Sequence, residues 1–246
     1  SRQPDDPRQV SEFPHLLVNQ ARVLDYFAEW MSYSPTRMTP DYGWEFTGLE
    51  ITGDATHCML FGGSRSGKTF LHTRNQVFRA LKAPASRHVA FRFRLNHIKA
   101  SLLMDTFPKV MRLAFPGVRY DLSKTDFVAT FPNESQLWFA GLDDKERTEK
   151  VLGQEFATLY FNECSQIPYG SVQTALTRLA QAATVKMQGR ADEPLKLRVF
   201  YDCNPPPKNH WTYRLFVQKR DPETLMPLAR PDDYVAFQMN PQDNAA

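Results

Sequence analysis

The sequence predicts an α/β protein with a mostly parallel central sheet and helices on both of its faces. Strand-like and helix-like segments alternate along the chain, which is typical of parallel strands joined by crossover helices. In addition, a glycine-rich loop separates a short apolar run at residues 57–61 from a helical pattern at residues 69–81. This strand–loop–helix order is the setting that a phosphate-binding loop requires.

The glycine-rich loop matches the pattern G-x-x-x-x-G-K-[ST] at every position. It reads Gly62-Gly63-Ser64-Arg65-Ser66-Gly67-Lys68-Thr69. The glycines allow backbone N–H groups to close around a phosphate chain. Lys68 would place its charge on the β- and γ-phosphates, and Thr69 would offer its hydroxyl to Mg²⁺. The alternative is a glycine-rich turn with an incidental lysine, which the flanking strand and helix disfavour.

The remaining elements follow from the periodicity of apolar residues and from turn signals. Helices are expected at residues 16–31, 96–114 (interrupted near Pro108), 169–182 and 211–217. Strands are expected at residues 88–94, 127–131, 136–140, 157–161 and 197–201. The strand at 88–94 alternates apolar with polar residues, so one of its faces should be polar. Residues 143–150 should form a charged loop or a short helix.

Length and composition set the limits of the domain organisation. We expect a flexible N-terminus at residues 1–14, one P-loop domain at residues 15–222 and a linker at residues 223–246. The formal net charge of +3 permits nucleic acid as a partner without arguing for it. The three cysteines cannot all pair and lack metal-ligand spacing, so we interpret them as core residues in a reducing compartment. No apolar run approaches the length of about 18 residues of a membrane span, so no membrane partner is expected.

A carboxylate follows the strand at residues 157–161. Glu163 would align the attacking water beside the γ-phosphate or accept its proton. Asn162 stands where a Mg²⁺-holding aspartate is expected. Its amide oxygen can hold a metal-bound water but brings no negative charge, so Mg²⁺ should be held more weakly, or chiefly by Thr69 and the phosphates. The alternative for this pair is an ordinary turn at the end of a strand.

A polar amide, Asn204, lies just beyond the strand at residues 197–201 and before three prolines. At that position it could sense the γ-phosphate and pass its loss to the next segment. An asparagine before proline is also common in ordinary turns, and the residues alone leave both interpretations open.

With these elements in this order, the chain resembles the ATPase domain of the large terminase subunit of tailed bacteriophages over residues 15–220. Apart from the P-loop, the resemblance is carried by residues 151–157, 160–166 and 204–213, which read VLGQEFA, YFNECSQ and NPPPKNHWTY. It implies a P-loop NTPase fold of the additional-strand, catalytic-glutamate type. It also implies ATP with Mg²⁺ as fuel and double-stranded DNA as the cargo that is moved into a procapsid.

The same resemblance implies partners and a location. The partners are a portal protein, a small terminase subunit and other copies of the chain, as a pentamer on the portal, although the isolated domain could be monomeric. The location is the host cell cytoplasm rather than the virion. Large terminases usually continue into a nuclease domain, toward which residues 223–246 would lead, and we predict no DNA cleavage from this chain.

The resemblance also implies roles for individual residues. The resemblance gives Lys68 and Thr69 the phosphates and Mg²⁺, and it makes Glu163 the catalytic carboxylate. Asn204 matches the coupling motif that links hydrolysis to movement, and Gln20 matches the glutamine that reads adenine.

The family also needs a positive charge against the transferred phosphoryl group. Arg65 could supply it within the subunit, whereas Arg147 or Lys150 could supply it from a neighbouring subunit. The alternative for each of these three residues is a solvated surface charge.

DNA contact is expected from the strand at 88–94 and the residues after it, with Arg92, Arg94, His97 and Lys99, or from residues 143–150. Phosphate contact of this kind is independent of sequence, as a translocating motor needs. A solvated face is the alternative for both segments. Two other functions stay open at this stage: a P-loop kinase acting on a small molecule, and a nucleotide-binding switch with little hydrolysis.

Overall fold

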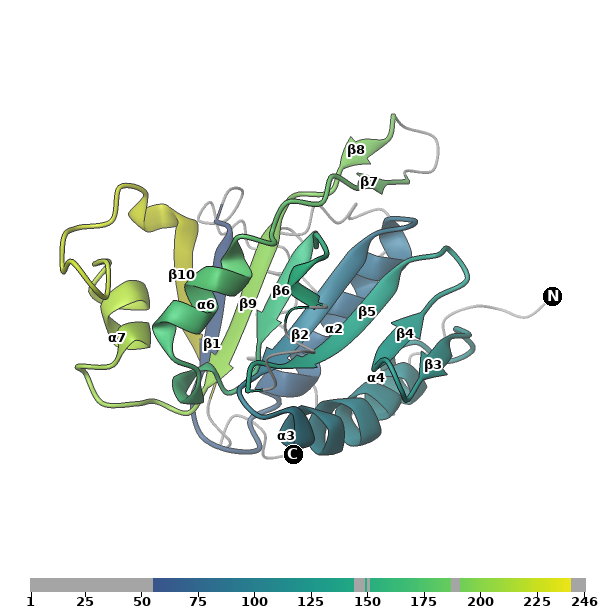
Figure 1. Ribbon diagram of the computed structural model, residues 1–246, viewed down its shortest axis with the longest axis horizontal. Coiled ribbons are helices and arrows are strands. Elements are labelled where there is room, and N and C mark those ends of the chain that lie inside the picture. Colours follow the sequence, from purple (N-terminus) through teal and green to yellow (C-terminus); the bar gives the residue numbers. More distant parts are fainter. Residues whose placement is uncertain (1–54, 144–148, 150, 187–190, 240–246) are drawn as a thin grey trace, which may run out of the picture.

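A computed structural model describes residues 55–143, 149, 151–186 and 191–239. Its core is an eight-stranded sheet with the order β10-β1-β9-β6-β2-β5-β4-β3 (Figure 1). The strands are β1 (His57–Phe61), β2 (Arg87–Arg92), β3 (Asp121–Ser123), β4 (Val128–Thr130), β5 (Gln136–Gly141), β6 (Thr158–Phe161), β9 (Arg198–Cys203) and β10 (Tyr234–Gln238). A separate antiparallel pair consists of β7 (Thr184–Val185) and β8 (Glu193–Pro194).

Helices cover both faces of this sheet. They are α2 (Lys68–Lys82), α3 (Leu95–Ile98), α4 (Phe107–Ala114), α6 (Tyr169–Leu176) and α7 (Trp211–Phe216), with a π-helix η4 (Lys99–Thr106) and the 3₁₀ turns η5 (Cys164–Gln166) and η6 (Pro231–Asp233). Buried residues of α2, η4 and α4 form one apolar core with the sheet, and those of α6 and α7 form another. In Figure 1, α6 lies in front of the strands and α2 behind them.

The six strands from β10 to β5 are parallel, and only β4 and β3 at one edge are antiparallel. The expected α/β class with a mostly parallel sheet is therefore confirmed. Parallel strands buried on both faces are mostly apolar. All six residues of β9 are buried, including the charged Arg198 and Asp202. The order places β9 between the strand before the P-loop and the strand before Glu163. This additional strand is the one that the predicted fold type requires.

Three buried polar side chains fasten α2 to the sheet. His72 Nε2 donates to the carbonyl oxygen of Tyr201 in β9 (2.9 Å), and Gln76 Nε2 donates to that of Val89 in β2 (2.9 Å). Arg79 Nε donates to the hydroxyl of Thr158 in β6 (2.7 Å). The helix that follows the P-loop is thus hydrogen-bonded to three neighbouring strands.

Several sequence-based expectations need correction. The predicted polar face of residues 88–94 is wrong, because His88 is fully buried and hydrogen-bonds to the hydroxyls of Ser86 and Thr158 (both 2.8 Å). The helix at 169–182 ends at Leu176. The interruption near Pro108 takes the form of the π-helix η4, which directly precedes α4 and keeps the helical path continuous while the proline supplies no N–H donor.

The predicted linker at residues 223–246 is also wrong for residues 234–238, which form β10 at the edge of the main sheet. All five residues of β10 pair in parallel with β1. Met239 follows, is 2% exposed, and its N–H donates to the Phe61 carbonyl oxygen (2.8 Å). Pairing with a distant strand creates this element. In the part of the chain that the structure describes, no helix has the length and apolar character needed to cross a membrane.

Candidate nucleotide-binding site

The P-loop runs from the end of β1 into α2, and its first glycine is required by close packing. A Cβ atom at Gly62 would come 1.8 Å from the carbonyl oxygen of Met239. The Gly62 N–H donates to the Cys203 carbonyl oxygen (3.3 Å), which ties the start of the loop to the end of β9. Gly67, directly before α2, has a φ of 86°, a left-handed conformation that favours glycine.

Lys68 lies across the loop rather than in solvent. Its Nζ donates to the carbonyl oxygens of Gly62 (3.0 Å) and Gly63 (2.7 Å) and to the Ser66 hydroxyl (3.0 Å). Burial lowers the pKa of Lys68, while the negative charges of Asp202 and Glu163 act in the opposite direction. The ammonium group and these two carboxylates therefore share one electrostatic environment.

Glu163 follows β6 in a left-handed conformation, with a φ of 47°. Its Oε2 accepts hydrogen bonds from Arg92 Nη2 (2.5 Å) and from Gln166 Nε2 (2.9 Å). The Glu163 side chain is 38% exposed, whereas that of Arg92 is 12% exposed. Arg92, one of the candidate residues for DNA contact, pairs with Glu163 in the structure.

Asp202, near the end of β9, is the acidic residue that the sequence analysis missed. Its Oδ1 accepts from the backbone N–H of Glu163 (2.6 Å), and its Oδ2 accepts from the hydroxyls of Thr69 (2.9 Å) and Tyr160 (2.8 Å). Burial raises the pKa of Asp202, and the hydrogen bond from Glu163, those from Tyr160 and Thr69, and the charge of Lys68 oppose this effect. The available signal was a carboxylate just past the predicted strand end at residue 201.

Asn162 lies beside Thr69, as its expected role requires. Its Nδ2 is 3.4 Å from the Thr69 hydroxyl, but it lies closer to Tyr160 OH (3.0 Å) and to the two carboxylate oxygens of Asp202 (3.1 and 3.2 Å). Asn162 is 2% exposed, and its Oδ1 has no hydrogen-bond partner. A metal-bound water is the kind of group that such an oxygen could accept from.

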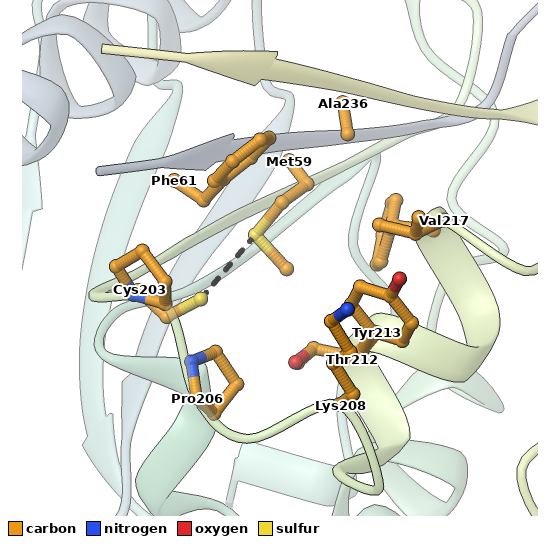
Figure 2. A pocket seen from close by; sticks show the side chains of 11 residues that line it. Met59, Phe61, Cys203, Pro206, Lys208, Thr212, Tyr213, Val217 and Ala236 are labelled. Atoms are coloured by element: carbon orange, nitrogen blue, oxygen red, sulfur yellow. Dashed lines mark hydrogen bonds between the residues drawn. The ribbon is translucent and has the colours of Figure 1, made fainter. Parts of the chain in front are cut away.

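Asn204 is exposed just beyond β9, and the prolines after it lead toward α7. This segment forms one wall of an apolar cavity of about 380 Å³. Figure 2 shows Met59, Phe61 and Cys203 on the sheet side, opposite Thr212, Tyr213 and Val217. The cavity lining offers none of the converging N–H groups of the P-loop, so it does not resemble a phosphate site.

The remaining predicted site residues are either exposed or outside the described part of the chain. Arg65 is exposed with a φ of 63°. Gln20, Arg147 and Lys150 lie outside the described residues. Arg94, His97 and Lys99 are exposed around the start of α3, as a DNA-contacting surface would need.

A phosphate-binding loop after one parallel strand, a glutamate after another and an additional strand between them define a P-loop NTPase fold. Residues 54–245 match the family described as phage terminase large subunit, and the chain belongs to this family. The match includes residues 223–245, which were expected to form the linker.

Solved structures agree with this assignment at the level of the fold. The large terminase of the thermophilic bacteriophage D6E superposes with a TM-score of 0.61 at 16% identity, over 82% of this chain and 44% of that one. A variant of the large terminase ATPase domain of Thermus phage P74-26 gives 0.50 at 15% identity, over 86% and 83%. The HK97 bacteriophage large terminase gives 0.51 at 12% identity, over 74% and 37%.

The D6E protein has also been solved with ADP and with ATP-gamma-S. The present chain spans less than half of that protein's length. Among curated sequences, one match is 54% identical over only 33 residues, which is 13% of this chain and 5% of the 3-hydroxybenzoate 4-monooxygenase of Comamonas testosteroni. So short a segment carries no argument about fold or activity.

Proposed function

We propose that this chain is the ATPase motor domain of a large terminase, which hydrolyses ATP to move double-stranded DNA into a procapsid. The observation that carries the proposal is the meeting of three charges at adjacent strand ends. Lys68 and Thr69 begin the helix after β1, Asp202 lies one residue before the end of β9, and Glu163 follows β6. Asp202 accepts hydrogen bonds from the Thr69 hydroxyl and from the Glu163 N–H, and the charges of both carboxylates act on the lysine. Family membership supports the same function.

Each of these residues has a defined task in hydrolysis. Lys68 exchanges its hydrogen bonds to the loop for bonds to the β- and γ-phosphates. Thr69 and Asn162 would hold Mg²⁺, which when bound would neutralise phosphate charge. Glu163 aligns the attacking water and accepts its proton, and its two hydrogen bonds to Arg92 and Gln166 fix the direction of the carboxylate.

Other parts of the proposal concern coupling and partners. Asn204 links loss of the γ-phosphate to the segment before α7, and Arg65 or Arg147 supplies positive charge to the transition state. Gln20 reads the adenine. The partners are double-stranded DNA, a portal protein, a small terminase subunit and further copies of the chain, in the host cytoplasm. The absence of DNA cleavage by this chain stays a prediction.

The catalytic part is tested by measuring phosphate release from ATP. Glu163→Ala should lower turnover by about 100-fold or more, because it removes the general base. Lys68→Ala should abolish turnover through loss of phosphate binding. Lys109→Ala and Glu193→Ala, at exposed positions on α4 and β8, are the matched controls and should leave turnover unchanged. Normal turnover in either site variant would disprove the site.

The motor part is tested by binding of the wild-type protein to DNA at several salt concentrations. A motor that binds phosphates should show affinity that falls steeply with salt: a plot of log affinity against log salt concentration should have a slope of about −0.9 for each phosphate contacted. ATP hydrolysis without any DNA binding would instead favour a kinase or another small-molecule enzyme. Nucleotide binding without hydrolysis would favour a switch.

A further inference from the structure

The buried carboxylate of Asp202 connects the two parts of the proposed ATP site. It accepts hydrogen bonds from the hydroxyl of Thr69 at the start of α2 and from the backbone N–H of Glu163 after β6. Asp202 is 1% exposed, and the side chains of Tyr160 and Asn162 complete its hydrogen bonds. A buried carboxylate is costly unless its oxygens are satisfied, and here both oxygens accept from several donors.

The hydrogen bond between Thr69 and Asp202 has a chemical consequence for the threonine. A hydroxyl has one proton and two lone pairs. Since Thr69 donates its proton to Asp202, its lone pairs point away from the carboxylate, and one of them faces Asn162 Nδ2 at 3.4 Å. The second lone pair can be presented to a cation, which is the task of this residue in a P-loop.

Asn162 adds an independent observation at the same place. Its amide nitrogen faces Asp202 and Tyr160, so the amide oxygen must point elsewhere. That oxygen is buried and has no hydrogen-bond partner. An unsatisfied buried acceptor normally costs about 1–3 kcal/mol, which a metal-bound water would remove.

The residues present fit a Mg²⁺ that arrives with its nucleotide. Among the described residues, no three His, Cys, Asp or Glu side chains gather where they could hold a metal ion by themselves. Mg²⁺ in phosphate-transferring sites is commonly held by one or two carboxylates together with substrate phosphates and waters. The Asp202 carboxylate and the Thr69 hydroxyl, which are hydrogen-bonded to each other, would form such a partial site with the amide of Asn162 beside both.

We propose that Asp202 is the carboxylate of the Mg²⁺ site, replacing from β9 the negative charge that Asn162 lacks on β6. This inference rests on the proposed nucleotide site. Asp202 orients the Thr69 hydroxyl so that its oxygen can face the ion, and it adds negative charge beside that oxygen, while Asn162 supplies a neutral acceptor and holds the carboxylate in place. We therefore expect ordinary Mg²⁺ affinity and not the weak binding that Asn162 alone would give.

The test measures metal affinity separately from hydrolysis. Binding of a fluorescent ATP analogue is measured with EDTA present. In a separate, EDTA-free sample of the metal-free nucleotide complex, Mn²⁺ is titrated while free Mn²⁺ is followed by its paramagnetic resonance. Asp202→Asn should weaken Mn²⁺ binding by roughly tenfold or more. Nucleotide binding in EDTA should change by less than about threefold, a difference within the usual scatter of such effects. Asp121→Asn, at an exposed position in β3, is the matched control and should bind Mn²⁺ like the wild type.

A charge exchange distinguishes a metal-site role from a purely structural one. In Asp202→Asn combined with Asn162→Asp, the carboxylate and the amide change places, and Mn²⁺ affinity should return to within about threefold of the wild type. This double variant also decides the question if Asp202→Asn alone does not fold, because it keeps one carboxylate in the network. Near-wild-type Mn²⁺ affinity in a folded Asp202→Asn protein, or a folded double variant that binds Mn²⁺ weakly, would overturn the inference. Failure of the wild type to bind the nucleotide at all would instead refute the proposed function.

Discussion

Removal of β10 should destabilise the whole domain, although its residues were expected to form a linker. The informative comparison is between a chain that ends at Asp233 and a chain that ends at Met239. Only the second chain keeps β10 and the buried methionine after it. The two chains differ in six residues, so they isolate the contribution of this edge strand.

The size of the effect follows from the contacts of β10. Val235 and Phe237 pack against the core that contains α2, and Met239 is 2% exposed. Full burial of one such side chain contributes about 1.5–3 kcal/mol, so one complete and two partial burials give roughly 3–6 kcal/mol. The total stability of a domain is typically about 5–15 kcal/mol. Loss of β10 would also expose the edge of β1, which precedes the P-loop.

Urea unfolding followed by circular dichroism measures this difference. The slope increases with chain length, so a value of about 3 kcal/mol per molar urea applies here, and the midpoint of the chain ending at Asp233 should fall by roughly 1–2 M. Equal midpoints for the two shortened chains would mean that β10 adds nothing to the fold, and the reasoning from burial would be refuted.

Three further outcomes are expected. Gly62→Ala should abolish nucleotide binding, because its Cβ would lie 1.8 Å from a backbone carbonyl oxygen that follows β10; intact binding in an equilibrium titration would contradict this. Arg92→Ala should lower DNA-independent ATP hydrolysis by roughly tenfold or more, since Glu163 loses its strongest orienting contact; the exposed Arg112→Ala is the control, and equal rates would refute the orienting role. The free energy of unfolding should fall as the pH drops below about 6.5, by about 1.4 kcal/mol per pH unit for each buried histidine that must stay neutral when folded. Burial lowers the pKa of these histidines to about 3 for His57 and His72 and well below 6.5 for His88. The stabilisation from these neutral histidines is therefore fully present above the pKa of histidine in the unfolded chain and is lost as the pH falls below it. Urea midpoints that stay constant between about pH 7 and pH 5 would contradict the burial of these groups.

Elements with a strong local pattern could be predicted from the sequence. The first strand, residues 57–61, has the same bounds as β1, and the helix after the P-loop differs by one residue at each end. The strands and turn around residues 132–135 were also found. These segments carry their signal in adjacent residues, through apolar runs, glycines and turn residues.

Long-range pairing could not be predicted in the same way. β10 has a weak local pattern after a proline-rich stretch, and it exists because β1 offers an unpaired edge. Asp202 was missed because the predicted strand ended two residues before β9 does. The partner of Arg92 lies 71 residues away, so no local pattern could separate a surface arginine from one that holds Glu163.

The three buried polar side chains that fasten α2 to the sheet affect how a movement in the proposed ATP site would be transmitted to the rest of the domain. Since His72, Gln76 and Arg79 each bond to a different strand, the helix behind the phosphates cannot slide without breaking several buried hydrogen bonds at once. The P-loop, α2 and the sheet therefore form a rigid unit. A movement that begins at the γ-phosphate would change this unit little and would appear mainly in the segment that follows β9.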